Sequence, residues 1–349
     1  MTHEYARVET PAAGLRLHLN ENTSGCSTAV IEAVRRITRE EAALYPDYSA
    51  AIAACARHLH VDETQLLLTN GLDEGILAAS IAALRGGGEA NPFEAIVVVP
   101  AFDMYATCAD AAGGRVIEVR QSDDFGFPLR TVLDAINPRT RIVFLTNPNN
   151  PTGLIVPREA ILAIADAAPG ATIFLDEAYA DFSGTTLIGD TALSARPNIV
   201  IGRTFAKAYG LAGLRIGALV AAPERLSPLR RVVPPYSLNA VAAQALPAAL
   251  ADTSHYASYL AQAKESKALL YRALDHLGVR YWNSEANFVL ARFGEDSRRV
   301  IDGLRVRGIY VRDRSTDHGC AGCVRITTGV LEHTRRCVTA IEEVMCDAR

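Results

Sequence analysis

The sequence predicts an α/β protein with a mostly parallel central sheet in a large domain, joined to a smaller α+β domain. Two features of the sequence predict this fold. Short apolar runs alternate with alanine-rich helical stretches over roughly the first two thirds of the chain, which is typical of strands buried between helices. After about Pro235 this alternation gives way to one long helical stretch, short strands and two more helices, which is typical of a separate α+β domain.

Seven runs are expected to form the large sheet, because each is short, apolar and rich in strand-forming residues. The alanine-rich stretches at 73–86 and 158–168 lie between such runs and show helical spacing, as expected for crossover helices. The glycine-rich run at 86–92 is expected to be a loop. The seven expected strands are 65–70, 95–100, 115–120, 141–147, 172–177, 198–204 and 215–221.

The expected small domain begins with a helical stretch at 239–278, in which Pro247 is predicted to bend or break the helix. Further along, helices are expected near 296–307 and from about residue 332. The apolar run at 15–20 has no obvious place in the large sheet, and we expect it to join the small domain. The predicted units are an N-terminal arm at 1–30, a large domain at 31–238 and a small domain at 239–349.

Composition and charge disfavour several functions. With 349 residues, 49% of them hydrophobic, and a net charge of -4, the chain is typical of a globular protein of two domains. Its mild acidity disfavours nucleic-acid binding, which needs a clustered basic face. The first residues do not form a basic segment followed by an apolar stretch, and the apolar runs are too short to cross a membrane. We therefore expect neither a nucleic-acid nor a membrane partner.

The seven cysteines indicate a reducing compartment. Their number is odd, and a chain of this length does not need disulfides, so reduced thiols in the cytoplasm are expected. Cys320 and Cys323 form a lone C-x-x-C that runs into a strand-like segment. A zinc site would need a second pair of cysteine or histidine ligands. We therefore expect no metal and interpret the two thiols as incidental.

Lys207 is a candidate nucleophile because it follows the expected strand 198–204 directly. In open α/β sheets, ligands bind beyond the carboxyl ends of the strands. A lysine held there among small residues could lose its hydration and become reactive toward an aldehyde. The glycine-rich segment that follows it, together with Arg215, could receive a phosphate. The alternative is that Lys207 is a solvated loop residue.

Asp176 ends the apolar strand 172–177, where a carboxylate is unfavourable without a cationic partner. It could cap a helix, or it could pair with a protonated ring nitrogen. The segment LTNPNNPTG at 145–153 is either a tight turn or a sharp exit that directs asparagine side chains over the sheet. TNGLDEG at 69–75 opens a helix after a strand and so offers an anion site, although it matches neither a P-loop nor a dinucleotide fingerprint.

Together and in this order, NPNNPTG, DEAY and TFAKAYGLAGLRIG resemble the class I/II aminotransferases, and they are most similar to histidinol-phosphate aminotransferases. The match extends over nearly the whole chain, from LHLNEN to VRITTG. The resemblance implies the aspartate-aminotransferase fold and the cofactor pyridoxal 5′-phosphate. It also implies transfer of an amino group from an L-amino donor, best L-histidinol phosphate in histidine biosynthesis, to 2-oxoglutarate.

The resemblance also implies roles for single residues. Lys207 would hold the cofactor as a Schiff base and then move the donor's Cα proton, and Asp176 would pair with the pyridinium nitrogen. Asn150 and Tyr179 would hydrogen-bond the phenolic oxygen. The other implied cofactor contacts are Phe102, stacked on the ring, and Leu72, Asp73, Thr204 and Arg215 around the phosphate.

Four further residues are implied to act on the substrate or across a dimer. Tyr45 resembles a tyrosine that reaches the cofactor phosphate and substrate site of the other subunit, which implies a homodimer. Arg325 resembles the arginine that binds the substrate's acidic group, and Arg312 a second anion contact of the histidinol-phosphate branch. Asn20 would lie near the substrate.

The chemistry of transamination agrees with these roles. Removing the Cα proton leaves a carbanion, and the cofactor ring accepts its charge only if the ring nitrogen stays protonated, which a buried carboxylate such as Asp176 enforces. The base must be a neutral amine, as Lys207 would be after release from the cofactor.

The sequence departs from the resemblance near the cofactor. Ala206 stands where the branch usually has serine, Ala101-Phe102-Asp103 replaces the usual Thr-Tyr-Gly, and Thr23 follows LNEN in place of proline. These departures leave the donor open. An aminotransferase for aromatic or other amino acids and a threonine-phosphate-type decarboxylase are alternatives of the same fold. A non-catalytic regulator is disfavoured by the intact site residues, and a nicotinamide oxidoreductase by the missing glycine fingerprint.

Overall fold

A computed structural model describes residue 8 and residues 11–88 and 90–346 of the chain. The remaining residues, which include most of the first ten of the predicted N-terminal arm, the last three of the predicted small domain and position 89 of the predicted loop, lie outside the described part.

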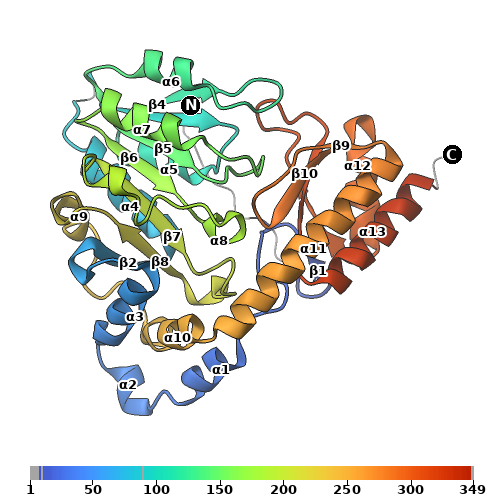
Figure 1. Ribbon diagram of the computed structural model, residues 1–349, viewed down its shortest axis with the longest axis horizontal. Coiled ribbons are helices and arrows are strands. Elements are labelled where there is room, and N and C mark those ends of the chain that lie inside the picture. The colour runs from blue at the N-terminus through green and yellow to red at the C-terminus, as the bar shows by residue number, and fades with distance from the viewer. Residues whose placement is uncertain (1–7, 9–10, 89, 347–349) are drawn as a thin grey trace.

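The seven expected strands form one sheet in the order β2-β8-β7-β6-β5-β3-β4 (Figure 1). The strands from β7 to β4 run parallel to their neighbours, and β8 runs antiparallel to both β7 and β2. The prediction of a mostly parallel α/β sheet is therefore confirmed. The strands are β2 Leu66–Asn70, β3 Glu94–Val99, β4 Arg115–Arg120, β5 Thr140–Thr146, β6 Thr172–Asp176, β7 Ile199–Thr204 and β8 Ile216–Val220.

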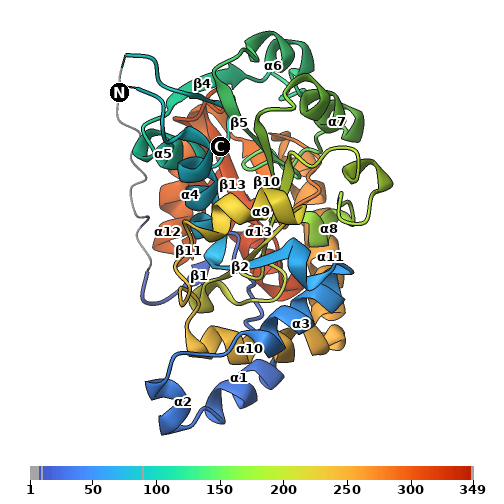
Figure 2. The ribbon, with the colours of Figure 1, turned by 90° about the vertical axis from the view of Figure 1, so that its left-hand side faces the viewer.

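Helices cover both faces of this sheet. Successive strand residues point to opposite faces, and the residues on both faces are apolar and buried by helices. Ala95 and Val97 of β3 belong to one buried cluster, which also includes residues of α4, α5 and α9. Ile96 and Val98 belong to another, with residues of α3, α6, α7 and α10. Helices α1, α2, α3 and α10 gather at one end of the molecule (Figure 2). The helices are α1 Thr28–Arg35, α2 Arg39–Ala43, α3 Ser49–Leu59, α4 Gly71–Leu84, α5 Met104–Ala111, α6 Leu129–Ala135, α7 Arg158–Ala167, α8 Ala180–Ser183, α9 Pro223–Arg230 and α10 Ala240–Ala251.

A third buried cluster forms beside the large sheet from the C-terminal elements and β1. Its four-stranded antiparallel sheet has the order β12-β13-β10-β9, and β1 pairs in parallel with β11. We propose that this core and the core of the large sheet correspond to the two predicted domains. The elements are α11 Thr253–Leu277, α12 Ser297–Val306, α13 Leu331–Cys346, β1 Leu15–Arg16, β9 Arg280–Tyr281, β10 Phe288–Arg292, β11 Ile309–Tyr310, β12 Arg312–Asp313 and β13 Cys323–Thr327.

The predicted break at Pro247 is wrong in position. Helix α10 continues through Pro247 to Ala251, because its packing against α1 and α3 outweighs one missing backbone hydrogen bond. The break comes at Asp252, which leaves helical geometry and accepts a hydrogen bond from the His255 N–H to cap α11. Within the described residues, no helix has both the length and the apolar character needed to cross a membrane.

Candidate active site

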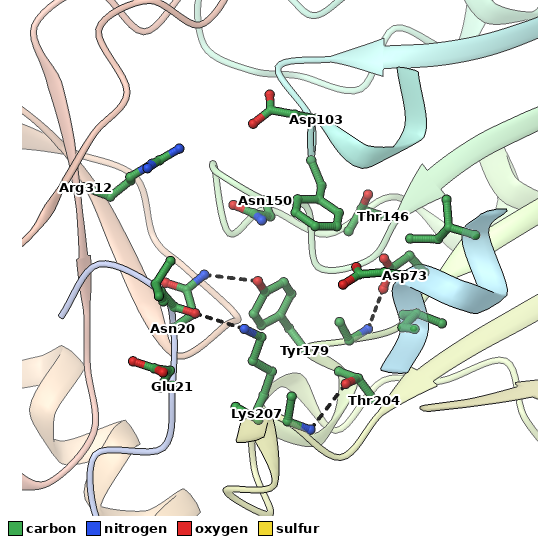
Figure 3. A pocket seen from close by; sticks show the side chains of 18 of the residues that line it. Asn20, Glu21, Asp73, Asp103, Thr146, Asn150, Tyr179, Thr204, Lys207 and Arg312 are labelled. Carbon is green, nitrogen blue, oxygen red and sulfur yellow. Dashed lines mark hydrogen bonds between the residues drawn. The ribbon is translucent and has the colours of Figure 1, made fainter. Parts of the chain in front are cut away.

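A cavity of about 380 Å³ lies where the carboxyl ends of β5, β6 and β7 face β12, β13 and the segment after β1 (Figure 3). The strand register brings these ends together, since Thr146 pairs with Asp176, and Asp176 with Gly202. Every predicted site residue except Tyr45 lines the cavity. The lining residues that were predicted are Asn20, Leu72, Asp73, Phe102, Asn150, Asp176, Tyr179, Thr204, Lys207, Arg215, Arg312 and Arg325.

Lys207 projects into the cavity from the loop between β7 and β8. Its Nζ donates a hydrogen bond to the carbonyl oxygen of Leu19 at 2.9 Å, so the lysine is held by the segment that follows β1 (Figure 3). Burial and then the nearby charge of Arg325 lower the pKa of Lys207 to about 8. A neutral, nucleophilic amine is therefore accessible close to neutral pH.

Asp176 lies at the floor of the cavity in a hydrogen-bonded group that the sequence did not reveal. The Tyr105 hydroxyl donates to Asp176 Oδ2 at 2.6 Å and lies 2.8 Å from Thr146 Oγ1, and the Ala178 N–H donates to Asp176 Oδ1 at 2.8 Å. Burial raises the pKa of Asp176 to about 6, although both hydrogen bonds lower it. Tyr105 is fully buried on α5, and no local motif connects it to Asp176, which lies 71 residues away.

Asp176 therefore has the environment that suits a cationic ring nitrogen. It forms no ion pair with a lysine or arginine of the described chain, and a buried carboxylate without a cation is unfavourable. The helix-cap interpretation is wrong, because α8 begins at Ala180 with Tyr179 at its N-cap. The residues present thus fit a ligand that carries a protonated nitrogen.

The start of helix α4, beside Arg215, is suited to bind a phosphate group. Helix α4 begins at Gly71, directly after β2, and its first N–H groups have no partner within the helix. A Cβ on Gly71 would come 2.6 Å from an Arg215 guanidinium nitrogen, and one on Gly217 would come 2.6 Å from the Leu72 nitrogen. The two glycines thus keep the helix start open beside Arg215. A helix N-terminus with an arginine at its side is an anion site.

The other phosphate candidates surround this helix start. Arg215 pairs with Asp73 at 2.8 Å, and Thr204 Oγ1 accepts a hydrogen bond from the Ala206 N–H at 3.2 Å. A serine hydroxyl in place of Ala206 would add one donor here, so the departure at Ala206 removes one polar contact.

Segments that are distant in sequence meet at Tyr179 and Arg325. The Asn20 amide donates to the Tyr179 hydroxyl at 3.0 Å. The buried guanidinium of Arg325 donates to Asn150 Oδ1 and, at 2.7 Å, to the carbonyl oxygen of His18. Asn20 adopts a positive φ of 56°, which asparagine tolerates better than most residues. The segment after β1, the turn after β5 and β13 thus assemble one wall.

This wall is strongly positive. Arg312 of β12 lies directly opposite Arg325 of β13, and Arg314 also lines the cavity. Burial is the main cause that lowers the pKa of Arg325 to about 10, and the charges of Arg314 and Arg312 contribute to this lowering. Arg312 has no ion-pair or hydrogen-bond partner in the described chain. Like charges on directly opposed strands are destabilising, so the arrangement favours an anionic ligand.

The sequence missed Arg314, although a signal was present. Residues two apart in an extended chain share a face, and Arg314 lies two residues after Arg312, just beyond the end of β12. It is the more buried of the two.

Tyr45 is the one predicted site residue that a single chain does not bring to the cavity. It lies between α2 and α3, its exposed fraction is 78%, and its ring stacks on that of Tyr236 at 4.3 Å. A role for Tyr45 in the site therefore requires a second subunit.

Comparison with known proteins gives a consistent match. The model of the family "Aminotransferase class I and II" matches residues 13–341. The histidinol-phosphate aminotransferase of Moorella thermoacetica is 35% identical over 338 residues, which cover 95% of this chain and 85% of the relative. That of Halorubrum lacusprofundi is 36% identical over 343 residues, which cover 95% of this chain and 89% of the relative.

Solved structures show the same fold. The histidinol-phosphate aminotransferase of Sinorhizobium meliloti, in complex with pyridoxal 5′-phosphate, matches with a TM-score of 0.84 and 26% identity, over 96% of this chain and 92% of that one. The aspartate aminotransferase of Thermus thermophilus, with maleate, matches with a TM-score of 0.80 and 23% identity, over 95% of this chain and 91% of that one. The predicted aspartate-aminotransferase fold is confirmed.

Proposed function

This chain belongs to the aminotransferase class I and II family, which uses pyridoxal 5′-phosphate, and on that premise we propose that it transfers the amino group of L-histidinol phosphate to 2-oxoglutarate. The observation that carries the choice of donor is the positive wall, in which Arg312 lies opposite Arg325 and has no partner among the residues that the structure describes. Relatives that are histidinol-phosphate aminotransferases support it. A role in histidine biosynthesis follows from the same donor.

We propose the following roles for the residues that would hold the cofactor. Asp176 would keep the ring nitrogen protonated, and Asn150 and Tyr179 would donate to the phenolic oxygen. Phe102 would pack on the ring. The phosphate would lie among the N–H groups of Leu72 and Asp73, the Thr204 hydroxyl and Arg215.

When bound, the cofactor supplies an aldehyde that takes up the amino group and a ring that accepts the electrons of the broken Cα–H bond. Lys207 would hold the cofactor, and once the donor has taken its place the neutral Nζ of Lys207 would take the proton from the donor's Cα. The Asn20 amide donates to the Tyr179 hydroxyl and would hold the Tyr179 side chain in place during the proton transfer.

The positive wall would bind the donor's phosphate. A phosphate carries nearly two charges and three acceptor oxygens, and the planar guanidinium suits such groups. Histidinol phosphate has no carboxylate, so its phosphate could engage both Arg312 and Arg325. The acceptor 2-oxoglutarate would place its carboxylates at the same wall, with Asn20 close to either substrate.

Arg312→Ala is expected to lower kcat/KM for histidinol phosphate by about tenfold to a few hundredfold, because a charged hydrogen bond contributes about 1.5–3 kcal/mol. With an aromatic amino acid, whose α-carboxylate needs only Arg325, the same variant should stay within about twofold of wild type. Arg325→Ala should impair both donors. Steady-state kinetics with each donor measure the difference, and Arg305→Ala, an exposed arginine on α12, is the control.

Two outcomes would overturn the phosphorylated donor. If Arg312→Ala leaves histidinol phosphate unaffected, or if wild type prefers the aromatic donor, a general amino acid aminotransferase replaces it. Release of CO₂ without transfer of nitrogen to 2-oxoglutarate would favour the decarboxylase.

We also propose a homodimer in which Tyr45 completes the site of the other subunit. Leu44, Tyr45 and Tyr236 are large side chains with exposed fractions of 69%, 78% and 54%. Clustered exposed apolar groups mark association surfaces.

Co-expression of Tyr45→Ala and Lys207→Ala subunits tests this dimer. Each homodimer is expected to be impaired, whereas the mixed dimer has one site with both defects and one with neither. Purified mixed dimers should therefore regain about half the wild-type activity per dimer. Mixed dimers no more active than the impaired homodimers would show that Tyr45 does not act across the interface.

A further inference from the structure

Arg314 connects the two proposed domains beside the cofactor cavity. It follows β12, and its side chain is only 6% exposed. One terminal nitrogen donates to the carbonyl oxygen of Ala101 at 3.3 Å, and the other lies 3.9 Å from Asp103 Oδ2. Ala101 and Asp103 are the two neighbours of Phe102, in the segment between β3 and α5. One small-domain side chain therefore contacts the large-domain residues on both sides of Phe102.

Asp317 balances the charge of Arg314. The two side chains form an ion pair, and the Asp317 N–H donates to the Arg314 carbonyl oxygen at 2.9 Å. Burial raises the pKa of Asp317, and Arg314 lowers it. A buried ion pair persists only when further hydrogen bonds satisfy it, and a planar guanidinium can serve several acceptors at once.

The three arginines of the positive wall differ in what occupies their terminal nitrogens. Arg312 has no partner in the described chain and is free to bind substrate. Arg325 is held by Asn150 and a backbone carbonyl. Arg314 directs its terminal nitrogens at protein acceptors from both domains. Its contacts therefore suit holding the protein together better than binding a ligand.

We propose that Arg314 is a positioning residue that fixes Phe102 against the cofactor ring and ties it to the positive wall. The proposal rests on the proposed function in one respect, the assignment of Phe102 to the ring. Asp103, whose side chain is 46% exposed, is the partner of Arg314 that lies nearest to the solvent. The Ala101-Phe102-Asp103 segment is thereby held from the small domain.

Arg314→Met removes the charge but keeps an unbranched side chain. We expect PLP to dissociate from the variant about tenfold more readily, as measured by titrating cofactor-free protein and following fluorescence. The kcat should fall by a similar factor for histidinol phosphate and for an aromatic donor alike, with the ratio of their KM values unchanged. The absorption and circular dichroism of the bound cofactor should change as Phe102 loosens. Arg314→Lys should recover only part, because one ammonium cannot reach all three acceptors.

Two further variants keep the test interpretable. Arg314→Met leaves Asp317 buried without a cation, so the double variant Arg314→Met, Asp317→Asn removes both charges and should unfold at nearly the wild-type denaturant concentration while keeping the weak PLP binding. Asp313→Asn is the matched control, since Asp313 is exposed and points to the other face of β12.

Three outcomes would overturn the proposal. Unchanged PLP binding with a higher KM for the phosphorylated donor alone would make Arg314 a direct anion contact. Wild-type behaviour of the double variant in all assays would leave it no role, as would full rescue of PLP binding in the double variant. Failure of wild type to use histidinol phosphate would instead refute the proposed donor, and the PLP titrations would still decide the role of Arg314.

Discussion

Lys207→Ala is expected to lose transamination almost completely. The residue has two successive tasks, holding the cofactor and moving the Cα proton, and alanine can perform neither. The lost proton transfer alone should lower kcat by about 10²–10⁴-fold. Single-turnover conversion of the pyridoxal form by the donor, followed by absorbance, measures this step separately from product release.

Chemical labelling can show directly which lysine holds PLP. The chain has only three lysines, Lys207, Lys264 and Lys267, so borohydride reduction and peptide mapping have three possible results. Lys267 is an internal control, because burial lowers its pKa too, but its Nζ donates to the carbonyl oxygen of Ser284 and it does not line the cavity. We expect the label on Lys207 alone, and a label on Lys264 or Lys267 would refute the assignment.

The lowered pKa of Lys207 adds a pH dependence. Only the neutral amine attacks an aldehyde, and the neutral fraction rises with pH until it levels off above the pKa. With a pKa of about 8, the rate at which PLP reconstitutes cofactor-free protein should rise through neutral pH and approach its plateau above about pH 8. A rate that still climbs tenfold per pH unit near pH 9 would show an unperturbed lysine.

The sequence predicted the positions of the seven large-sheet strands because each is a local apolar run that packs in the way its pattern indicates. It also predicted Lys207, Asn150 and Tyr179 as site residues, and all three line the cavity. Each lies in one of the motifs that, in their order along the chain, resemble a known family. Local sequence could not place Tyr105 beside Asp176, since the contact depends on the strand order of the sheet. The sequence could have indicated Arg314 as a cavity residue, because it lies two residues after Arg312 and so on the same face of an extended chain.

Two other differences have physical causes outside local sequence. Proline weakens a helix by one hydrogen bond, yet α10 passes through Pro247 because it is packed between other helices. Tyr45 is exposed in a single chain, so its proposed role depends on contact with a second subunit. In each case the surroundings, rather than the residue type, decide the outcome.

Asp176→Asn is expected to keep the fold and much of the bound PLP but to lower kcat by about a hundredfold to a few thousandfold. The amide has nearly the same shape. Its one oxygen can still accept from the Ala178 N–H, and its NH2 group can donate to the Tyr105 hydroxyl, which can in turn donate to Thr146 Oγ1, so local packing survives. It carries no charge, however, and cannot keep a ring nitrogen protonated. Breaking a buried charge pair costs about 3–5 kcal/mol, and each 1.36 kcal/mol in the barrier is a factor of about ten in rate.

Tyr105→Phe separates the charge of Asp176 from its hydrogen bond. Burial raises the pKa of Asp176, and the Tyr105 hydroxyl lowers it, so phenylalanine should raise it further. Since the ionised carboxylate is the active form, the acidic limb of the kcat profile should move to higher pH, with activity near wild type on the alkaline side. Asp176→Asn should instead be slow at every pH, because it has no carboxylate to ionise. Near-normal turnover of Asp176→Asn would mean that Asp176 only fixes the turn at Ala178, and an unmoved profile for Tyr105→Phe would mean that its hydroxyl does not influence the carboxylate during turnover.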